Sequence, residues 1–415
     1  MNQPIKDDDV LLVSYVRTPV GKFNGSLSNK NATDLGALVI KNALSKVQGW
    51  MTLSDVGEVF MGNVLSSNLG QAPARQSALK AGLPESVPCT TVNKVCASGM
   101  KAIMMGAMSI MTKQRQVVVC GGMENMSQVP YYLPNMRNGK RLGDSTCVDG
   151  MIKDGLWDVY NNVHMGTAAD KCSKDHSISR EEQDAYAILS HSRSNENKKH
   201  IENEIAPVGE FKNDESVNVN NFDKLKKLKP VFGDSITAGN SSPLSDGASC
   251  VILCSGSFFL SKCKNLPADV FLIRAFDDAA VSPMQFTIAP SKVVPPLLKK
   301  LNLNVSDIDY WEINEAFAVV ALANQKLLKI EPEKLNVFGG GVSFGHPIGS
   351  SGCRIVVTLC NILSQRNGRL GCAAICNGGG GASGLVVERL VRHQRSKMYF
   401  PHRVILEIRL VKLVL

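Results

Sequence analysis

Residues 98–122 read SGMKAIMMGAMSIMTKQRQVVVCGG and contain one complete unit of a helix followed by a strand. The segment 98–113 is rich in Met and Ala and predicts a helix, whereas 117–120 is a continuous apolar run, typical of a strand covered on both faces. Gly121 and Gly122 end that strand. Since strands and helices alternate on both sides of this unit, the sequence predicts an α/β fold with a largely parallel sheet.

The same alternation extends outward from this unit in both directions, apart from one polar and irregular region in the middle of the chain. Apolar runs predict strands, and periodic apolar stretches predict helices. These patterns predict strands at 10–14 and 88–92 and helices at 33–47, 71–82, 165–176 and 180–200. We therefore expect an N-terminal half at 1–122, an inserted loop domain at 123–245, a C-terminal half at 246–390 and a basic extension at 391–415.

Two segments of the chain echo each other. Ser98-Gly99, a helix, a strand and Gly121 match Ser351-Gly352, a helix, a strand and Gly378. The spacing between the two glycines is 22 residues in the first segment and 26 in the second, so the second needs a loop about four residues longer. This pattern predicts an internal duplication.

The composition excludes several classes of protein. With 415 residues, of which 44% are hydrophobic and 20% charged, the chain is neither disordered nor a coiled coil. No apolar run reaches the roughly 18–20 residues that span a bilayer, so we expect no membrane insertion. The net charge of +9 comes without a basic stripe interleaved with aromatic residues, so we expect no nucleic-acid partner. Twelve cysteines without zinc-type spacing indicate a reduced compartment and no metal site.

Cys96 is the first candidate for chemistry, because it lies between a predicted strand and a predicted helix. The backbone N–H groups at a helix N-terminus favour a thiolate and lower the pKa of a cysteine from about 8.5. Lys94 either adds to this effect or is simply solvated. The plainer interpretation of Cys96 is a small buried residue at a tight turn.

Three further candidates lie near glycines or at strand ends. His346 follows a glycine-rich segment, and Cys376 opens the turn CNGGGG, whose backbone N–H groups are suited to an oxyanion hole. No Gly-Lys-Ser/Thr follows that turn, so a phosphate loop of the Walker A type is excluded. Asn314 follows a predicted strand, where α/β folds place functional groups, although a helix N-cap is the plainer role for it. For His346 the plainer role is a structural histidine.

Taken together, these motifs resemble the thiolase family, and the resemblance runs from about residue 10 to 390. The closest group within it is the acetoacetyl-CoA thiolases, or acetyl-CoA C-acetyltransferases, of the mitochondrial type. The resemblance implies two similar βαβαβαββ halves, packed as a layered α/β structure with an inserted loop domain, in a homodimer or homotetramer. The motifs are NKVCASG at 93–99, GGMENMS at 121–127, NEAF at 314–317, GHPIG at 345–349 and CNGGGG at 376–381.

The resemblance also implies a mechanism, the reversible Claisen condensation of two acetyl-CoA molecules to acetoacetyl-CoA and CoA. Cys96 forms the acetyl-enzyme, His346 takes the proton of Cys96, and Cys376 abstracts the α-proton of the second acetyl-CoA. The backbone N–H groups of Cys96 and Gly378 form one oxyanion hole, and His346 with a water held by Asn314 forms the other. Coenzyme A thioesters are the substrates, and no permanently bound cofactor is needed.

Six further residues match positions that bind the substrate in the family. They form the short acyl pocket, contact the pantetheine or lie near the nucleotide end of coenzyme A. These residues are Leu156, His164, Met165 and Phe286 around the acyl group, Ser242 at the pantetheine and Lys224 near the nucleotide.

The chain departs from the family at several points. His191 stands where the mitochondrial type has Tyr, at a position tied to potassium binding, so a potassium site is in doubt. Ser245 replaces an Asn, and Thr287 replaces a Pro associated with branched acyl groups. The extension 391–415 exceeds the family's usual length, and we expect it to be dispensable.

Three other functions stay open, together with the compartment. A broad-chain 3-ketoacyl-CoA thiolase of fatty-acid degradation would differ in its preference for longer substrates, and an inactive CoA-binding scaffold would lack turnover. A zinc or Cys–His hydrolase site is weaker, because no carboxylate or third ligand accompanies the pair. The N-terminal residues MNQPIKDDDV resemble neither a secretory signal nor a transit peptide, so we expect the cytoplasm, or the mitochondrial matrix from the resemblance.

Overall fold

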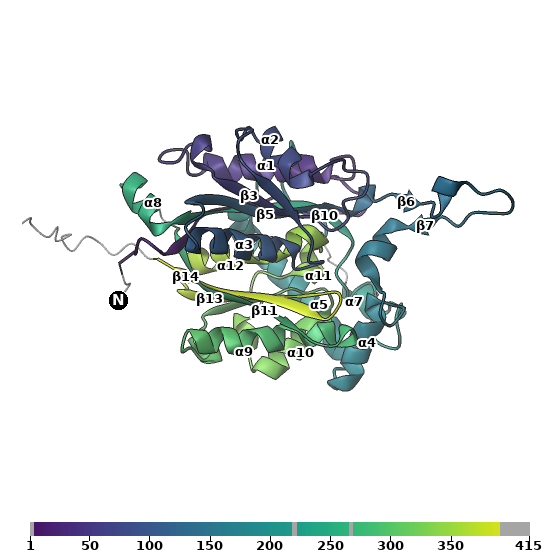
Figure 1. Cartoon of the computed structure of the whole chain (residues 1–415). Helices are drawn as coiled ribbons and strands as arrows, with labels where there is room; N and C mark the ends of the chain where they lie inside the picture. Colours follow the sequence, from purple (N-terminus) through teal and green to yellow (C-terminus); the bar gives the residue numbers. More distant parts are fainter. Residues whose placement is uncertain (1–3, 218–221, 265–268, 391–415) are drawn as a thin grey trace, which may run out of the picture.

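Five layers of secondary structure, with helices and sheets in turn, build the molecule (Figure 1). The computed structural model describes residues 4–217, 222–264 and 269–390. The two strand layers are halves of one continuous hydrogen-bonded sheet. Helices cover each strand layer on its outer face, and two helices fill the space between the two strand layers. The outer helices are α1 (Ala32–Ser45) and α2 (Pro73–Lys80) on one side and α9 (Pro290–Lys300) and α10 (Ala318–Leu328) on the other, and the central pair is α3 (Ser98–Met111) and α12 (Ile348–Gln365).

The long strands are joined edge to edge in the order β12-β13-β14-β11-β1-β10-β5-β3-β4. In one half of the molecule these strands are β1 (Val10–Arg17), β3 (Glu58–Gly62), β4 (Cys89–Val92), β5 (Val117–Asn125) and β10 (Ser245–Ser255). In the other half they are β11 (Phe271–Ala280), β12 (Tyr310–Ile313), β13 (Leu370–Asn377) and β14 (Gly381–Arg389). A short strand, β2 (Gly21–Lys22), pairs with β10.

The expectation of a largely parallel sheet is wrong. Only the pairs β3–β4, β3–β5 and β12–β13 are parallel among the described strands, and the other pairs in this sheet are antiparallel. The strands β13 and β14 form a hairpin across a glycine turn, and β10 returns from the insertion antiparallel to β5. Apolar runs show that both faces of a strand are buried, but they carry no information about its direction.

The same succession of strands occurs twice. The series β3–β5–β10–β1 is paired parallel, antiparallel and antiparallel, and the series β12–β13–β14–β11 has the same sequence of pairings. The helix α3 precedes β5 in the chain, as α12 precedes β13. This agreement is the structural counterpart of the echo between the two glycine-containing segments.

Two glycines let the central helices approach each other. A Cβ atom on Gly99 would lie 2.7 Å from the backbone N of Cys353, and one on Gly352 would lie 2.5 Å from the backbone N of Met100. Both distances are too short for any side chain, so the backbones of α3 and α12 touch at their N-terminal ends. The residues just before these two helices are therefore brought to one place in the molecule.

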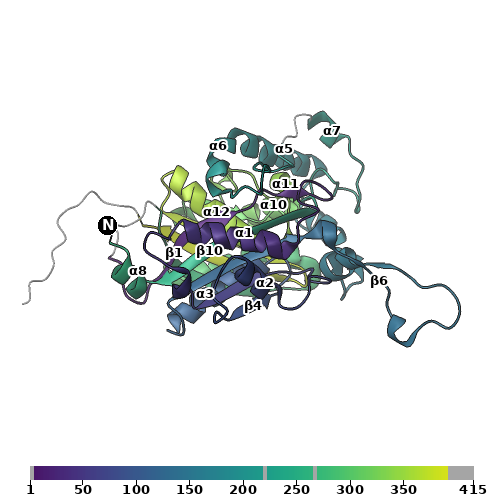
Figure 2. The same ribbon diagram turned by 90° about the horizontal axis from the view of Figure 1, so that it is seen from above.

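The region between β5 and β10 lies at one side of the layers. Figure 2 shows α5, α6 and α7 along one edge and the hairpin of β6 and β7 projecting away from the body. The helices of this region are α4 (Met165–Asp175), α5 (Arg180–Glu196), α6 (Lys198–Ile201) and α7 (Phe222–Lys226). Its strands are β6 (Tyr131–Tyr132), β7 (Val148–Asp149), β8 (Trp157–Asp158) and β9 (Val163–His164). Two further helices lie elsewhere, α8 (Gly256–Lys262) and α11 (Gly341–Phe344).

The strands and helices predicted in the first half and the insertion are confirmed, with shifts of a few residues at their ends. None of the helices in the described ranges is long and apolar enough to cross a bilayer. The basic extension 391–415 lies outside the described residues.

Candidate active site

Cys96 lies in a strained turn between β4 and α3. Val95 has φ +48°, an uncommon conformation for a β-branched residue. The side chain of Asn93 accepts the N–H of Val95 at 3.0 Å. The hydroxyl of Ser98 accepts the N–H of Lys94 at 2.8 Å and donates to the carbonyl of Val95 at 2.6 Å. These bonds hold the turn in place, so the thiol is presented at the start of the helix.

The glycine turn between β13 and β14 reaches the thiol of Cys96. The backbone N–H groups of Gly378 and of Cys96 itself lie close enough to the sulfur to lower its pKa. The turn depends on Gly379 and Gly380, whose φ values are +85° and +90°. Two N–H groups therefore converge next to the thiol of Cys96, an arrangement suited to an oxyanion hole.

The expectation that the helix N-terminus lowers the pKa of Cys96 is wrong. Burial raises the pKa of this thiol to about 11, although the two N–H groups act in the opposite direction. Burial, with Cys96 as a neighbour, also raises the pKa of Cys376 well above its usual value. Both cysteines are thus thiols at neutral pH, and Cys96 needs a base to become a nucleophile.

His346 lines the same cavity as Cys96 and is the candidate base. It is buried just before α12, and its Nε2 lies 3.5 Å from the amide nitrogen of Asn314. Burial, aided by the positive charge of Arg354, lowers the pKa of His346 to about 3. The imidazole is therefore neutral at pH 7 and can accept a proton.

Glu124 ties the surrounding loops together. Its fully buried carboxylate accepts N–H groups from the side chain of Asn63 at 2.8 Å and from the backbones of Val64, Leu65 and Gly349 at 2.9–3.2 Å. Burial raises the pKa of Glu124 to about 7. This carboxylate links the loop after β3 to the segment that carries His346, and sequence reasoning missed it because a single Glu in a motif shows no partner.

Lys94 is neither a simple solvated residue nor a free charge beside the thiol. Its ammonium group pairs with Asp278 on β11 and donates to the hydroxyl of Ser383 on β14 at 2.9 Å. Lys101 on α3 pairs with the same carboxylate at 2.6 Å. Lys94 thus joins the turn of Cys96 to the strands that lead to the glycine turn.

A cavity of about 480 Å³ opens onto Cys96, His346 and Gly378. Its lining is mostly apolar, as a pocket for an acyl chain and pantetheine requires. The predicted binding residues that line it are Leu156, His164, Met165, Ser242 and Phe286. Cys376 and Asn314 are buried behind this lining. Lys224 is exposed on α7 and is not among the lining residues, so the cavity offers no support for its predicted contact.

Phe232 is a lining residue that sequence reasoning missed. Its ring stacks on His164 with centroids 4.3 Å apart and planes at 14°. His164 in turn caps α4, because its Nδ1 accepts the N–H of Gly166 at 3.1 Å. An aromatic residue within a polar, irregular stretch was the only available signal, and it was too weak to place the residue.

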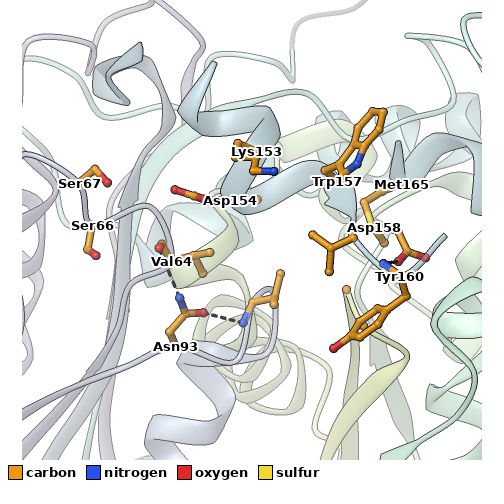
Figure 3. Close-up of a pocket in the computed structure, with 15 residues that line it drawn as sticks. Val64, Ser66, Ser67, Asn93, Lys153, Asp154, Trp157, Asp158, Tyr160 and Met165 are labelled. Carbon is orange, nitrogen blue, oxygen red and sulfur yellow. Dashed lines mark hydrogen bonds between the residues drawn. The ribbon is translucent and has the colours of Figure 1, made fainter. Parts of the chain in front are cut away.

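A second, polar cavity of about 490 Å³ meets the first one at Met165, Gly155 and Gly378. Figure 3 shows Lys153, Asp154, Asn93 and Tyr160 around it, and the bond from Asn93 to the carbonyl of Val64 along one side. Two of its polar side chains share one partner outside the lining: the hydroxyl of Tyr132 lies 2.6 Å from that of Ser67 and donates to Asp154 at 2.7 Å. The catalytic candidates thus lie between an apolar and a polar cavity.

His191 is buried on α5, and its Nδ1 makes no hydrogen bond among the described residues. Burial lowers the pKa of His191 to about 4, so this side chain is neutral at pH 7. Its ring lies 6.4 Å from that of Phe222. Within the described residues, no group of three or more His, Cys, Asp or Glu side chains could hold a metal ion.

Known proteins share both the fold and the sequence of this chain. The family model described as "Thiolase, N-terminal domain" matches residues 10–257, and "Thiolase, C-terminal domain" matches residues 269–389. Acetyl-CoA acetyltransferase 1 of Arabidopsis thaliana is 50% identical over 408 residues, covering 94% of this chain and 97% of the plant protein. The acetyl-CoA acetyltransferase of Schizosaccharomyces pombe is 49% identical over 397 residues, covering 92% of this chain and 99% of the yeast protein.

A solved structure agrees with these matches. The crystal structure of the Acat5 thiolase from Ascaris suum in complex with coenzyme A is similar with a TM-score of 0.87 and 40% identity, over 92% of this chain and all of that one (100%). A layered α/β fold that brings Cys96 and His346 to one apolar cavity, as in this family, is typical of acyl-transferring enzymes. The chain belongs to the thiolase family. The fold class and the family expected from the sequence are therefore confirmed.

Proposed function

We propose that this chain is an acetyl-CoA C-acetyltransferase, which condenses two acetyl-CoA molecules to acetoacetyl-CoA and CoA and catalyses the reverse thiolysis. The observation that carries the proposal is the meeting of Cys96, Gly378 and His346 at one apolar cavity, with the amide of Asn314 3.5 Å from Nε2 of His346. The relatives that share about half of its residues bear the name acetyl-CoA acetyltransferase.

The first half-reaction forms the acetyl-enzyme. Cys96 transfers its proton to Nε2 of His346 and attacks the thioester carbon of acetyl-CoA. The carbonyl oxygen, now negatively charged, is stabilised by the N–H groups of Cys96 and Gly378. CoA leaves as a thiolate and takes a proton from Cys376, so that Cys376 becomes a thiolate beside the acetylated Cys96.

The second half-reaction forms the carbon–carbon bond. The thiolate of Cys376 removes the α-proton of the second acetyl-CoA, and the enolate oxygen is stabilised by the imidazolium of His346 and a water held by Asn314. The enolate attacks the acetyl group on Cys96. The released sulfur regains its proton from His346, and every group returns to its starting state.

The inserted segment supplies most of the substrate pocket in this proposal. Met151, Leu156, Met165, Phe232 and Ser242 all line the cavity, and all five belong to the inserted segment. The hydroxyl of Ser242 donates to the carbonyl of Ala316 at 2.9 Å, so its contact with pantetheine would use its oxygen as an acceptor. Residues 123–245 therefore act in this proposal as a CoA-binding insertion between the two halves of the chain.

Assembly, compartment and ion dependence stay predictions from the resemblance. We expect a homodimer or homotetramer, in the cytoplasm or the mitochondrial matrix. Potassium dependence is a prediction of the same kind, and the contacts of His191 do not bear on it.

The experiment that tests the function is CoA-dependent cleavage of acetoacetyl-CoA, together with intact mass after exposure to acetyl-CoA. Wild-type protein should turn over acetoacetyl-CoA and gain one acetyl group, whereas Cys96→Ser should lose at least 10³-fold in kcat, an order-of-magnitude expectation for removal of a nucleophile. Cys147→Ser is the matched control, because this thiol is exposed and lies on the projecting hairpin.

Two outcomes would contradict the proposal. Folded wild-type protein without turnover and without an adduct would favour a CoA-binding scaffold. Equal or faster cleavage of longer 3-ketoacyl-CoA substrates would instead favour the broad-chain thiolase.

A further inference from the structure

His346 has a partner on the side of its ring opposite the active site. The hydroxyl of Ser351, on the first turn of α12, lies 2.5 Å from Nδ1 of His346. His346 is 6% exposed and Ser351 1%, so water cannot replace this bond. No role follows for Ser351 from the reaction steps themselves, since it does not line the cavity.

The surroundings of Ser351 determine which atom holds the proton. A serine hydroxyl has a single proton, and that of Ser351 is placed to go to the carbonyl of Pro347, 2.9 Å away. The oxygen can then only accept a hydrogen bond from His346. Nδ1 of His346 must therefore carry a proton.

The other end of the ring leads independently to the same result. The oxygen of the Asn314 side chain faces the guanidinium of Arg354 at 3.5 Å, so the amide group of Asn314 points its nitrogen at Nε2 of His346. An amide nitrogen is only a donor, and its partner must offer a lone pair. Nε2 is therefore the unprotonated atom.

We propose that Ser351 is a positioning residue, which holds His346, a residue of the cavity lining, as the neutral tautomer with the proton on Nδ1 and with Nε2 unprotonated. This inference rests on the proposed function, in which Nε2 accepts the proton of Cys96. When Nε2 becomes protonated, Nδ1 keeps its bond to Ser351, so the ring does not need to turn between the two half-reactions.

The duplication of the fold gives this assignment a parallel. Ser98 precedes Gly99 as Ser351 precedes Gly352, and each pair lies in the first turn or so of one of the central helices: Ser98 is the first residue of α3, and Ser351 is the fourth residue of α12. Ser98 donates to the carbonyl of Val95 at 2.6 Å and thereby holds the turn of the nucleophile. Ser98 thus holds the turn of Cys96 in one half, and Ser351 holds His346 in the other.

The test uses nitrogen NMR of protein labelled with ¹⁵N-histidine, because the shifts of the two ring nitrogens distinguish the tautomers. The chain has seven histidines, and the signals lost in His346→Gln identify those of His346. We expect the Nδ1–H tautomer in the wild type and its loss in Ser351→Ala. We also expect kcat to fall at least tenfold in Ser351→Ala with KM unchanged, and Ser351→Thr to restore both the tautomer and kcat. Ser350→Ala is the matched control, since Ser350 is equally buried but bonds Ser249 at 2.8 Å.

The outcomes separate this inference from the proposed function. An Nε2–H tautomer in the wild type overturns it, even if Ser351→Ala fails to fold. Retention of the Nδ1–H tautomer and of full kcat in folded Ser351→Ala overturns it as well. A wild type that shows the Nδ1–H tautomer, loses it in Ser351→Ala and yet has no thiolase activity would refute the function and leave the tautomer assignment intact.

Discussion

Burial sets the protonation state of the reacting groups. It raises the pKa of Cys96 to about 11 and lowers that of His346 to about 3, so the resting pair is a neutral thiol and a neutral imidazole. Separating charge between them in an apolar site is unfavourable without compensation. The N–H groups at the sulfur and the negative charge that moves onto the substrate oxygen provide that compensation, so the proton moves only when substrate is bound.

Cys376→Ala should separate the two half-reactions. The variant should still form an acetyl adduct on Cys96, because the departing CoA thiolate can take its proton from water, but condensation and exchange of the α-protons of acetyl-CoA should fall about 10²–10⁴-fold, the usual contribution of a general base. Intact mass and solvent deuterium exchange measure the two steps. Cys372→Ala, a buried thiol of the same strand, should leave both unchanged in folded protein. Full condensation activity in Cys376→Ala would show that another group acts as the base.

The buried neutral His191 should reduce stability in acid. Its pKa is lowered from 6.5 to about 4, so below pH 6.5 the unfolded chain takes up a proton that the native state does not. Stability is therefore fully present above pH 6.5 and is lost as the pH falls toward 4, by about 3 kcal/mol at most. His191→Tyr removes this titration, and urea denaturation at pH 7.5 and pH 5 should show a smaller difference than in the wild type. An equal difference in both proteins would show that His191 is not responsible.

At the scale of elements, the hairpin of β13 and β14 holds Cys376 at the end of one strand and Gly378 in the turn. The glycines of this turn differ in how much space a side chain would have. A Cβ atom on Gly380 would lie 2.2 Å from the carbonyl of Val281, whereas one on Gly378 would meet nothing closer than 3.5 Å. The position of the Gly378 N–H thus depends on Gly380, which shapes the turn.

Gly380→Ala should therefore destabilise the protein by about 1–3 kcal/mol. Alanine is strained at the positive φ of this position, and its Cβ atom clashes with the backbone of Val281. Gly378→Ala has no such clash and is the matched control. Thermal or urea denaturation checks the difference in stability. Equal stability of the two variants would contradict this account of the turn.

At the scale of the whole molecule, the candidate active site forms where the N-terminal ends of α3 and α12 contact each other. Cys96 precedes one helix and His346 precedes the other, and they are 250 residues apart in the chain. Gly99 and Gly352 allow the backbones to touch there. Glu124 holds the adjoining loops across the same junction.

Gly352→Ala should push the two central helices apart. We expect a loss of about 1–3 kcal/mol in stability and a fall in kcat, since a methyl group has no space against the backbone of Met100. Denaturation and acetoacetyl-CoA cleavage measure the two effects. Gly49→Ala is the control for the change of residue type, because a Cβ atom there meets nothing within 4 Å. A variant as stable and active as the wild type would show that the contact is not needed.

The sequence by itself determined the fold class, the family and most helices and strands, because apolar periodicity and glycine-rich motifs are local properties of the chain. It also singled out Cys96, His346 and Cys376 as candidates. The tertiary structure alone decided three matters: the antiparallel direction of most strand pairs, the raised pKa of Cys96 and the partners of Lys94, Glu124 and Ser351. Strand direction and ion pairing depend on where distant segments meet, and a pKa depends on the burial of the group and its neighbours. None of these is a property of neighbours along the chain.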